Sequence, residues 1–163
     1  MEYAIRRART SDVRAIGGLV DDNVDSGRLL AKATVTLYED VQEFWIAERA
    51  GGREVIGCGA LHVLWEDLAE IRTIAVHEDC QGEGVGHRLV EALLGSAREL
   101  GVRRVFVLTF AVGFFAGHGF KPIDGTPVSY QVYEELLRSY DEGVAEFLDL
   151  EKVKPNTHGM HRA

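Results

Sequence analysis

The chain of 163 residues is long enough to bury the core of a single domain. Its content of 46% hydrophobic and 27% charged residues is ordinary for a soluble globular protein. A formal net charge of -8 argues against nucleic acid or an anionic membrane as the main partner, while leaving room for an acidic small molecule in a local basic pocket. No apolar run is long enough to cross a bilayer and the N-terminus lacks a signal-peptide stretch, so we expect a cytoplasmic location.

The first third of the chain predicts one strand followed by helices. Thr10 and Ser11 are residues that commonly cap helix N-termini, and Asp12 suits the first turn of the helix that they would begin. The expected elements are a strand over 3–8, a helix from 10 to about 20, a loop or broken helix over 21–32, and a short helix over 34–41.

Three consecutive strands are expected next, over 44–49, 54–65 and 68–76, and together they form an antiparallel meander. Gly57 and Gly59 fall inside the second of these strands. Glycine within a strand indicates either a β-bulge or a close approach of another backbone or side chain.

The clearest helix of the sequence is expected over 84–100, because Val85, Leu89, Leu93 and Ala97 recur at four-residue steps. Gly101 follows it as a C-terminal capping residue. The remaining elements are a buried strand over 105–109, helices over 112–118 and 130–140, a last strand over 144–150, and a loose tail over 155–163. This order predicts one α+β (mixed α/β) domain over residues 1–154.

The segment Q-G-E-G-V-G-H at Gln81–His87 joins the third meander strand to the long helix. It is not a Walker loop, because no Gly-Lys-Ser/Thr is present, and it is not a dinucleotide fingerprint, because His87 stands where the third glycine is required. What remains is a glycine-rich turn at a helix N-terminus, where backbone N–H groups can hold a phosphate or pyrophosphate. A plain strand-to-helix turn is the alternative interpretation.

The context of this turn resembles a known enzyme family. Gln81, Gly84 and Gly86 fit the pattern Gln/Arg-x-x-Gly-x-Gly/Ala, after a strand I-x-x-I-A-V and before F-F-A-G-H-G-F. This set is similar to the GCN5-related N-acetyltransferase (GNAT) superfamily over nearly the whole chain. The resemblance implies a splayed, mostly antiparallel sheet of about six to seven strands flanked by helices, with acetyl-CoA as co-substrate and no metal.

The resemblance also implies which residues bind coenzyme A. The backbone of the strand before the loop would bind the pantetheine arm, and the loop amides would hold the pyrophosphate. The implied cofactor-binding residues are Ile74, Ala75, Val76, Gln81, Gly82, Glu83, Gly84, Val85, Gly86, His87 and Phe115.

More narrowly, A-E-I-R-T-I-A-V, C-G-A-L-H and F-V-L-T resemble the acetyltransferase domain of N-acetylglutamate synthases and the short amino-acid N-acetyltransferases of actinobacterial type. This resemblance implies acetyl transfer to the α-amine of L-glutamate or L-glutamine, the first step of arginine biosynthesis, by direct attack in a ternary complex. Two alternatives stay open: another amine acceptor, such as a protein N-terminus or a polyamine, and a non-catalytic acyl-CoA-binding module.

Glu70 and Arg72 lie two residues apart on the third meander strand, so both side chains are expected on one face. One interpretation is that the two residues form a surface cross-strand charge pair without a catalytic role. The resemblance implies instead that Glu70 is the base, directly or through water, and the planar fork of Arg72 suits a substrate carboxylate. Lys32 falls where the synthases carry substrate-binding basic residues, although a solvated loop lysine is as good an interpretation.

Thr109 ends the strand F-V-L-T, where the family carries a serine or threonine near the sulfur and where the hydroxyl could donate to the leaving thiolate. Phe115 stands where many members have a tyrosine that acts as general acid, and it cannot donate a proton. His62 and His118 are minor candidates for acid or base. The expected partner is a small-molecule amino acid, with neither nucleic acid nor membrane, and the oligomeric state is left open between monomer and homodimer.

Overall fold

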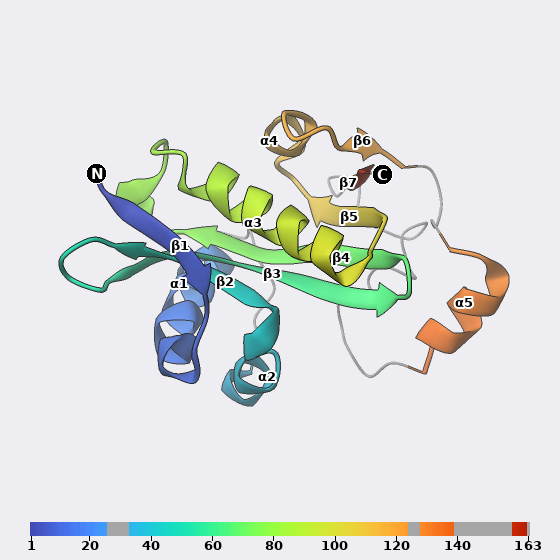
Figure 1. The fold of residues 1–163 in the computed structure, drawn as a ribbon, viewed down its shortest axis with the longest axis horizontal. Helices are drawn as coiled ribbons and strands as arrows, with labels where there is room; N and C mark the ends of the chain where they lie inside the picture. Colours follow the sequence, from blue (N-terminus) through green and yellow to red (C-terminus); the bar gives the residue numbers. More distant parts are fainter. Residues whose placement is uncertain (26–32, 124–127, 139–157, 163) are drawn as a thin grey trace. The chain divides into compact units, whose positions relative to one another are not determined.

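The computed structural model describes residues 1–25, 33–123, 128–138 and 158–162. The chain divides into two compact units, which we describe separately. The first unit comprises Met1–His62 and Ile71–Glu99, and the second comprises Val63–Glu70 and the residues from Leu100 onward. The mixed α+β class and the GNAT fold expected from the sequence are confirmed, and within the described residues we observe seven strands (Figure 1).

The first unit is built on an antiparallel meander. Its strands are β1 (Tyr3–Arg7), β2 (Phe44–Arg49), β3 (Val55–Trp65) and β4 (Leu68–Val76), in the spatial order β1-β2-β3-β4. Strand β2 is antiparallel to both β1 and β3. The register between β2 and β3 shifts at Ala47/Glu48, so Ala47 lies opposite Gly57 and Glu48 lies opposite Val55. The extra residue, Ile56, forms the β-bulge that the glycines of this strand had indicated.

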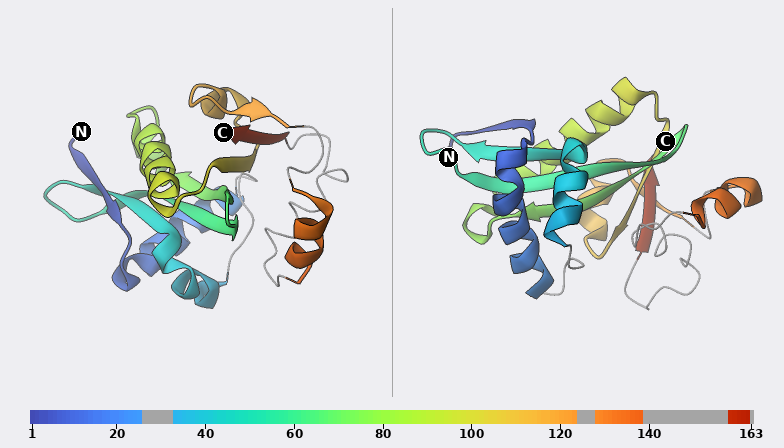
Figure 2. Two further views of the ribbon diagram at one scale, coloured as in Figure 1. Left: turned by 45° about the vertical axis from the view of Figure 1, so that its right-hand side comes forward. Right: turned by 90° about the horizontal axis from the view of Figure 1, so that it is seen from below.

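Helices cover both faces of this meander (Figures 1 and 2). A 3-10 turn η1 (Thr10–Asp12) leads into α1 (Val13–Asp25), and α2 (Thr34–Glu39) and the 3-10 turn η2 (Val41–Glu43) precede β2. Helix α1 extends five residues further than expected, so the prediction of a loop from residue 21 is wrong for 21–25. Leu19, Val20 and Val24 explain the extension, because they continue the apolar stripe that packs on the sheet.

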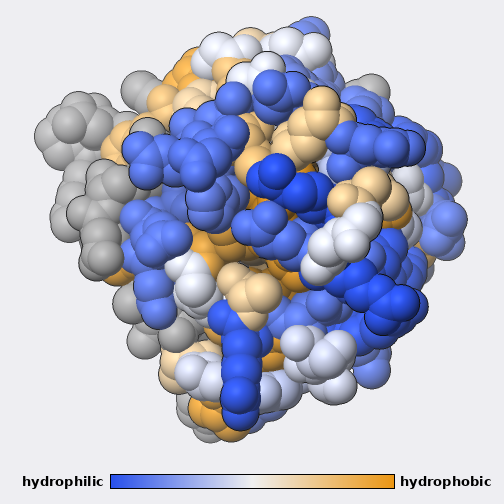
Figure 3. Space-filling model, turned by 90° about the vertical axis from the view of Figure 1, so that its left-hand side faces the viewer, coloured by the Kyte–Doolittle hydropathy of each residue, from blue (hydrophilic) through white to orange (hydrophobic). Residues whose placement is uncertain are grey.

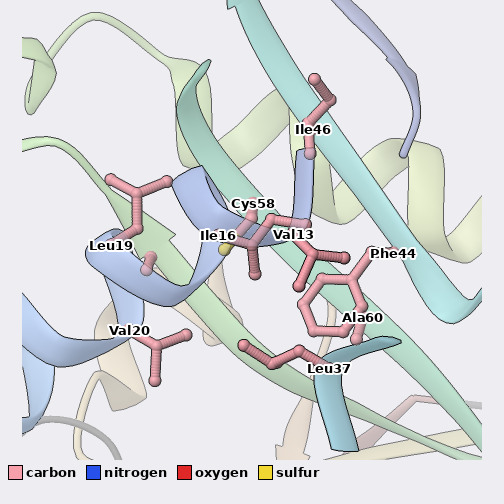
Figure 4. Close-up of a cluster of buried hydrophobic side chains, with 10 residues drawn as sticks. Val13, Ile16, Leu19, Val20, Leu37, Phe44, Ile46, Cys58 and Ala60 are labelled. Atoms are coloured by element: carbon pink, nitrogen blue, oxygen red, sulfur yellow. The ribbon is translucent and has the colours of Figure 1, made fainter. Parts of the chain in front are cut away.

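One core cluster lies between α1, α2 and the sheet, and Figure 4 shows Ile16 of α1 over Cys58 of β3. The second lies between the sheet and α3 (Val85–Leu100), which follows a 3-10 turn η3 (Glu78–Cys80). Neighbouring residues of β2 alternate between the two, with Ile46 in the first cluster and Ala47 in the second. This alternation is the period-two pattern of a strand buried on both faces.

The two strand glycines of β3 face α3. A β-carbon on Gly57 would lie 2.9 Å from Cγ1 of Val85, and one on Gly59 would lie 2.5 Å from Cδ1 of Ile74 and 3.1 Å from Cδ1 of Leu93. The close approach that the glycines indicated is therefore confirmed. Gly101 ends α3 with a φ of 83°, as its capping role requires.

The second unit contains the start of β4, β5 (Arg104–Thr109), α4 (Val112–Ala116), β6 (Lys121–Pro122), α5 (Tyr130–Leu136) and β7 (His158–Arg162), with the strand order β4-β5-β7-β6. Leu68, Phe106 and Leu136 form its buried cluster. Arg104 joins β5 to the β3–β4 turn by donating its backbone N–H to the carbonyl of Asp67 (2.9 Å) and its Nε to the carboxylate (3.1 Å).

Strand β7 corrects one expectation, because residues 158–162 lie within the segment predicted to be a loose tail. The strand pairs antiparallel with β5 on one side and with β6 on the other. Backbone pairing on both edges orders a strand without an apolar pattern, and T-H-G-M-H-R has none, so the sequence carried little signal for it. The strand expected over 144–150 lies outside the described residues.

Candidate active site

The glycine-rich segment leads directly into the first turn of α3. Gly82 and Gly84 have left-handed φ values of 82° and 78°, which glycine adopts without steric cost. A β-carbon on Gly82 would meet no atom within 4 Å. The backbone N–H of Arg88 donates to the carbonyl of Gly84 (3.1 Å), so residues 85–87 form the first turn of the helix. An open backbone at the positive end of a 16-residue helix fits an anionic group such as a pyrophosphate.

The side chains of this loop divide into two kinds. Gln81, Glu83 and His87 are exposed, whereas Val85 is 1% exposed and packs with Leu89 in the core beneath α3. Val85 therefore contributes to the loop only through its backbone, while its side chain fixes where the helix begins on the sheet.

Strand β4 presents the three residues expected along the pantetheine arm. Ala75 belongs to the cluster beneath α1 and α2, while Ile74 abuts Gly59 on the α3 side and Val76 packs against the cluster beneath α3. All three side chains are thus committed to packing. What the strand offers a ligand is its backbone, which is the part that the resemblance implied would bind the pantetheine arm.

Thr73 interrupts β4 in a way that the sequence did not predict. Its φ of 59° is left-handed, an outlier for a β-branched residue, and it is 6% exposed. Its carbonyl accepts a hydrogen bond from Sγ of Cys58 (3.5 Å). Conformations of this kind cost about 1–3 kcal/mol and persist where the surroundings enforce them. The alternation of side chains between the two faces of the sheet, from which we placed Glu70 and Arg72 on one face, is therefore interrupted after Arg72.

Glu70 and Arg72 lie on β4 just before this interruption. Glu70 is 5% exposed and is one of the few buried charged residues in the described part of the chain, and Arg72 is half-buried. Charged side chains are seldom buried unless they are paired or functional. Both residues take part in polar or electrostatic interactions within the fold. Glu70 is therefore not a solvated surface charge, whereas Arg72 keeps part of its surface exposed.

Thr109 ends β5 and is half-buried. Its Oγ1 accepts a hydrogen bond from the backbone N–H of Ala111 (2.9 Å), which lies beyond the strand. The hydroxyl oxygen is thus held by the segment that follows the strand. Because a hydroxyl both accepts and donates, this bond holds the oxygen in place and leaves the proton for donation.

Phe115 lies in α4, is 4% exposed, and packs edge-on against Phe114 and Phe120, with ring centroids 5.0 and 5.4 Å apart. These contacts explain a large aromatic residue at this position without any proton transfer. The His118 ring lies 5.3 Å from that of Phe114.

The two cysteines are reduced and buried. Burial raises the pKa of the Cys58 thiol to about 12, so it is protonated at neutral pH and is a poor nucleophile. Cys80 is 1% exposed, and its sulfur accepts a hydrogen bond from Nη2 of Arg49 (3.3 Å). His62 is half-buried, and its Nδ1 lies 2.8 Å from Oε1 of Glu43. Cys80 and His62 thus each have a polar partner within the fold.

The first unit brings together the loop Gln81–His87, the end of β4 and the start of α3. Glu70, Thr109 and Phe115 belong to the second unit, and each is described above in its own surroundings. Lys32 lies outside the described residues.

Sequence reasoning missed three residues beside the loop. Tyr3, Arg49 and Arg88 contact it or its flanks, and the first two come from strands far from it in the sequence. No local pattern could have found them, because their contacts depend on the tertiary fold.

Two further searches concern the described residues only. They contain no group of three or more histidine, cysteine or acidic side chains arranged to hold a metal ion. None of their helices combines the length and the apolar character needed to span a membrane.

Known families and structures resemble this chain closely. The model of the acetyltransferase (GNAT) family matches residues 22–120, which is more than half of the chain. An amino-acid acetyltransferase of Mycobacterium tuberculosis is 59% identical over 160 residues, covering 97% of this chain and 91% of the relative.

Two solved structures share the fold and hold coenzyme A. The Mycobacterium tuberculosis protein Rv2747, in complex with CoA and a ligand designated NLQ, has a TM-score of 0.91 at 57% identity, covering 97% of each chain. N-acetylglutamate synthase of Neisseria gonorrhoeae, complexed with coenzyme A and N-acetyl-glutamate, has a TM-score of 0.77 at 27% identity. That alignment covers 99% of this chain and 35% of the synthase.

Proposed function

Because the chain belongs to the acetyltransferase (GNAT) family, we propose that it moves the acetyl group of acetyl-CoA to the α-amine of L-glutamate or L-glutamine. This reaction would be the first step of arginine biosynthesis. The observation that carries the acceptor class is the 59% identity, over nearly the full length of both chains, to an amino-acid acetyltransferase. The solved complexes with CoA and with CoA plus N-acetyl-glutamate support the same pair of substrates.

In this proposal the loop Gln81–His87 holds the pyrophosphate of acetyl-CoA. The left-handed Gly82 and Gly84 let the backbone approach the phosphates, and the N–H groups at the start of α3 donate to them. The backbone of Ile74, Ala75 and Val76 binds the pantetheine arm, because their side chains are already packed in the core.

The acceptor amine must lose a proton before it attacks the thioester, since an α-amine is mostly protonated at neutral pH. Glu70 is the base in this proposal, acting directly or through water. Its burial supports the role, because a carboxylate held inside the fold can be fixed in position to accept a proton.

The acceptor also carries an α-carboxylate and a second polar group. Arg72, two residues from Glu70 on the same strand, can bind a carboxylate with two parallel hydrogen bonds. We assign it to the substrate carboxylate, together with Lys32.

The leaving thiolate needs a donor, and Phe115 cannot supply one. Thr109 has an oxygen fixed by the N–H of Ala111 and a proton to give, so we assign it to the sulfur of coenzyme A. Direct attack by the amine is favoured over a covalent acyl-enzyme, because Cys58 has a strongly raised pKa and Cys80 is buried.

The test is an assay of free CoA released from acetyl-CoA with a panel of acceptors, followed by mass spectrometry of the product. The panel contains L-glutamate, L-glutamine, L-aspartate, spermidine and a peptide with a free N-terminus. Release that depends on glutamate or glutamine, with an N-acetylated product, supports the proposal. Release only with spermidine or the peptide would move the acceptor to another class, and tight CoA binding without any turnover would favour a non-catalytic module.

A cytoplasmic location is an additional prediction, which cell fractionation tests. The oligomeric state stays open between monomer and homodimer, and light scattering of the purified chain decides between them.

A further inference from the structure

Two residues that are paired across β1 and β2 hold the glycine-rich loop and the residue that precedes it. Tyr3 and Arg49 are register partners at the start of the meander. The Oη of Tyr3 donates to the carbonyl of Glu83 (3.3 Å), and Nη2 of Arg49 donates to Sγ of Cys80 (3.3 Å). One contact lies just before the loop and the other lies within it.

Tyr3 is itself fixed from the helix side of the loop. The guanidinium of Arg88 lies over its ring, with Cζ 4.9 Å from the centroid, and Nη1 lies 3.5 Å from the Tyr3 carbonyl. The ring also packs against the cluster of Cys80, Val85 and Leu89. A cation over an aromatic face at an exposed site contributes about 0.5–1 kcal/mol, so the phenol is held in a defined position.

The loop needs such support because its own residues restrict it little. Gly82 and Gly84 are the two left-handed residues, and glycine loses more backbone entropy on ordering than any other residue. A β-carbon on Gly84 would meet the Oη of Tyr3 at 3.8 Å and nothing else within 4 Å. A loop that must present N–H groups to an anion binds more tightly if it is ordered beforehand, because the entropy is then lost on folding rather than on binding.

We propose that Tyr3, held by Arg88 and paired with Arg49, is a positioning residue that pre-orders the loop Gln81–His87 for the pyrophosphate of acetyl-CoA. The hydroxyl bonds to the loop carbonyl, so in this proposal it acts through the loop. Its bond to Glu83 turns that carbonyl towards β1, so that the amide of the same peptide unit, which belongs to Gly84, points the opposite way. This proposal rests on the proposed role of the loop.

The test compares wild type with Tyr3→Phe, which removes only the hydroxyl and keeps the ring beneath Arg88. Calorimetry gives the Kd for CoA, and steady-state kinetics give kcat/KM for acetyl-CoA and for S-acetyl-pantetheine, which lacks the pyrophosphate. Loss of one hydrogen bond predicts a Kd for CoA raised about threefold to tenfold, with kcat and the midpoint of thermal unfolding unchanged. Activity with S-acetyl-pantetheine stays at the wild-type value. Tyr130→Phe, at a tyrosine that is 74% exposed on α5, is the matched control and leaves all values unchanged.

The outcomes distinguish a failure of the positioning role of Tyr3 from a failure of the proposed function on which it rests. If wild type binds neither CoA nor acetyl-CoA, the proposed function fails and Tyr3 has no role in it. If wild type binds CoA and Tyr3→Phe binds it equally well, the positioning role is wrong while the proposed function stands. Equal losses with acetyl-CoA and S-acetyl-pantetheine, or a lowered unfolding midpoint, would also overturn it, because they indicate a general structural role.

Discussion

Gly57 of β3 lies directly against Val85, the first residue of α3. A β-carbon on Gly57 would come within 2.9 Å of Cγ1 of Val85 and 3.4 Å of the carbonyl of Ala75. The absence of a side chain on this glycine lets the helix begin close to the sheet, and the residues that begin the helix are those that present N–H groups at the glycine-rich loop. Core packing and the candidate cofactor site are therefore linked at this contact.

Gly57→Ala should lower the free energy of unfolding by about 1–3 kcal/mol, because Val85 has no flexible far end that could move aside. It should also weaken CoA binding by displacing the start of α3. The control is Gly95→Ala on α3. An added β-carbon there meets nothing within 4 Å, and alanine should stabilise the helix by about 0.5–1 kcal/mol. Urea unfolding measures both. Equal stability of the two variants would contradict the close contact.

The charge network of Arg6, Asp12 and Glu48 predicts how stability depends on pH. Arg6 donates to both oxygens of Asp12, at 2.8 and 3.0 Å, and its Nε donates to Glu48 (2.8 Å). The hydrogen bonds from Arg6 hold the pKa of Asp12 below its ordinary value, against the opposing effect of burial. They also raise the pKa of Arg6.

Since the folded-state pKa of Asp12 is the lower one, its contribution is fully present above the unfolded value of about 3.9 and is lost as the pH falls through the folded value. Asp12→Asn should cost about 2 kcal/mol at pH 7. Below pH 4, the free energy of unfolding of the Asp12→Asn variant should depend less on pH than that of wild type. Unfolding curves between pH 2 and pH 7 measure this, and parallel curves for the two proteins would show that Asp12 does not carry the dependence.

Neither thiol should be required for turnover. Cys58 lies beneath Ile16 of α1 (Figure 4), and Cys80 lies in the cluster beneath α3. Cys80→Ala should keep kcat within about twofold, since direct transfer uses no enzyme thiol, and the native protein should react slowly with a disulfide reagent. Complete loss of kcat in a folded Cys80→Ala, together with an acetylated wild-type cysteine by mass spectrometry, would establish a covalent route instead.

Glu70→Gln should lower kcat by about 10²- to 10⁴-fold at pH 7, the range that general base catalysis contributes. The loss should diminish as the pH approaches the pKa of the α-amine, where the acceptor deprotonates without a base. Glu99→Gln is the control, because the side chain of Glu99 is 77% exposed. A pH–rate profile of the variant parallel to that of wild type would argue for a structural Glu70.

The face that carries the N-terminus is mostly polar, with apolar residues showing between the polar ones (Figure 3). Sequence reasoning found the loop because a glycine pattern and a helix pattern meet there. It could not find Tyr3, since the bond from its hydroxyl to Glu83 joins residues 80 positions apart.

The regular helices and strands were predictable because their patterns lie in short stretches of the sequence. The apolar stripe of α3 and the apolar run F-W-I-A of β2 are local patterns, and both elements form where they were expected. Strand β7 was not predictable, because its order comes from pairing with β5 and β6. The left-handed Thr73 was not predictable either, because the conformation opposes the preference of a β-branched residue.

The most direct test of the site is a crystal structure of the protein with CoA and L-glutamate bound. We predict the pyrophosphate within hydrogen-bond distance of the N–H groups at the start of α3, the amino acid beside Glu70 and Arg72, and the Oη of Tyr3 still on the carbonyl of Glu83. A pyrophosphate bound away from the loop Gln81–His87, or an amino acid that contacts neither Glu70 nor Arg72, would contradict it.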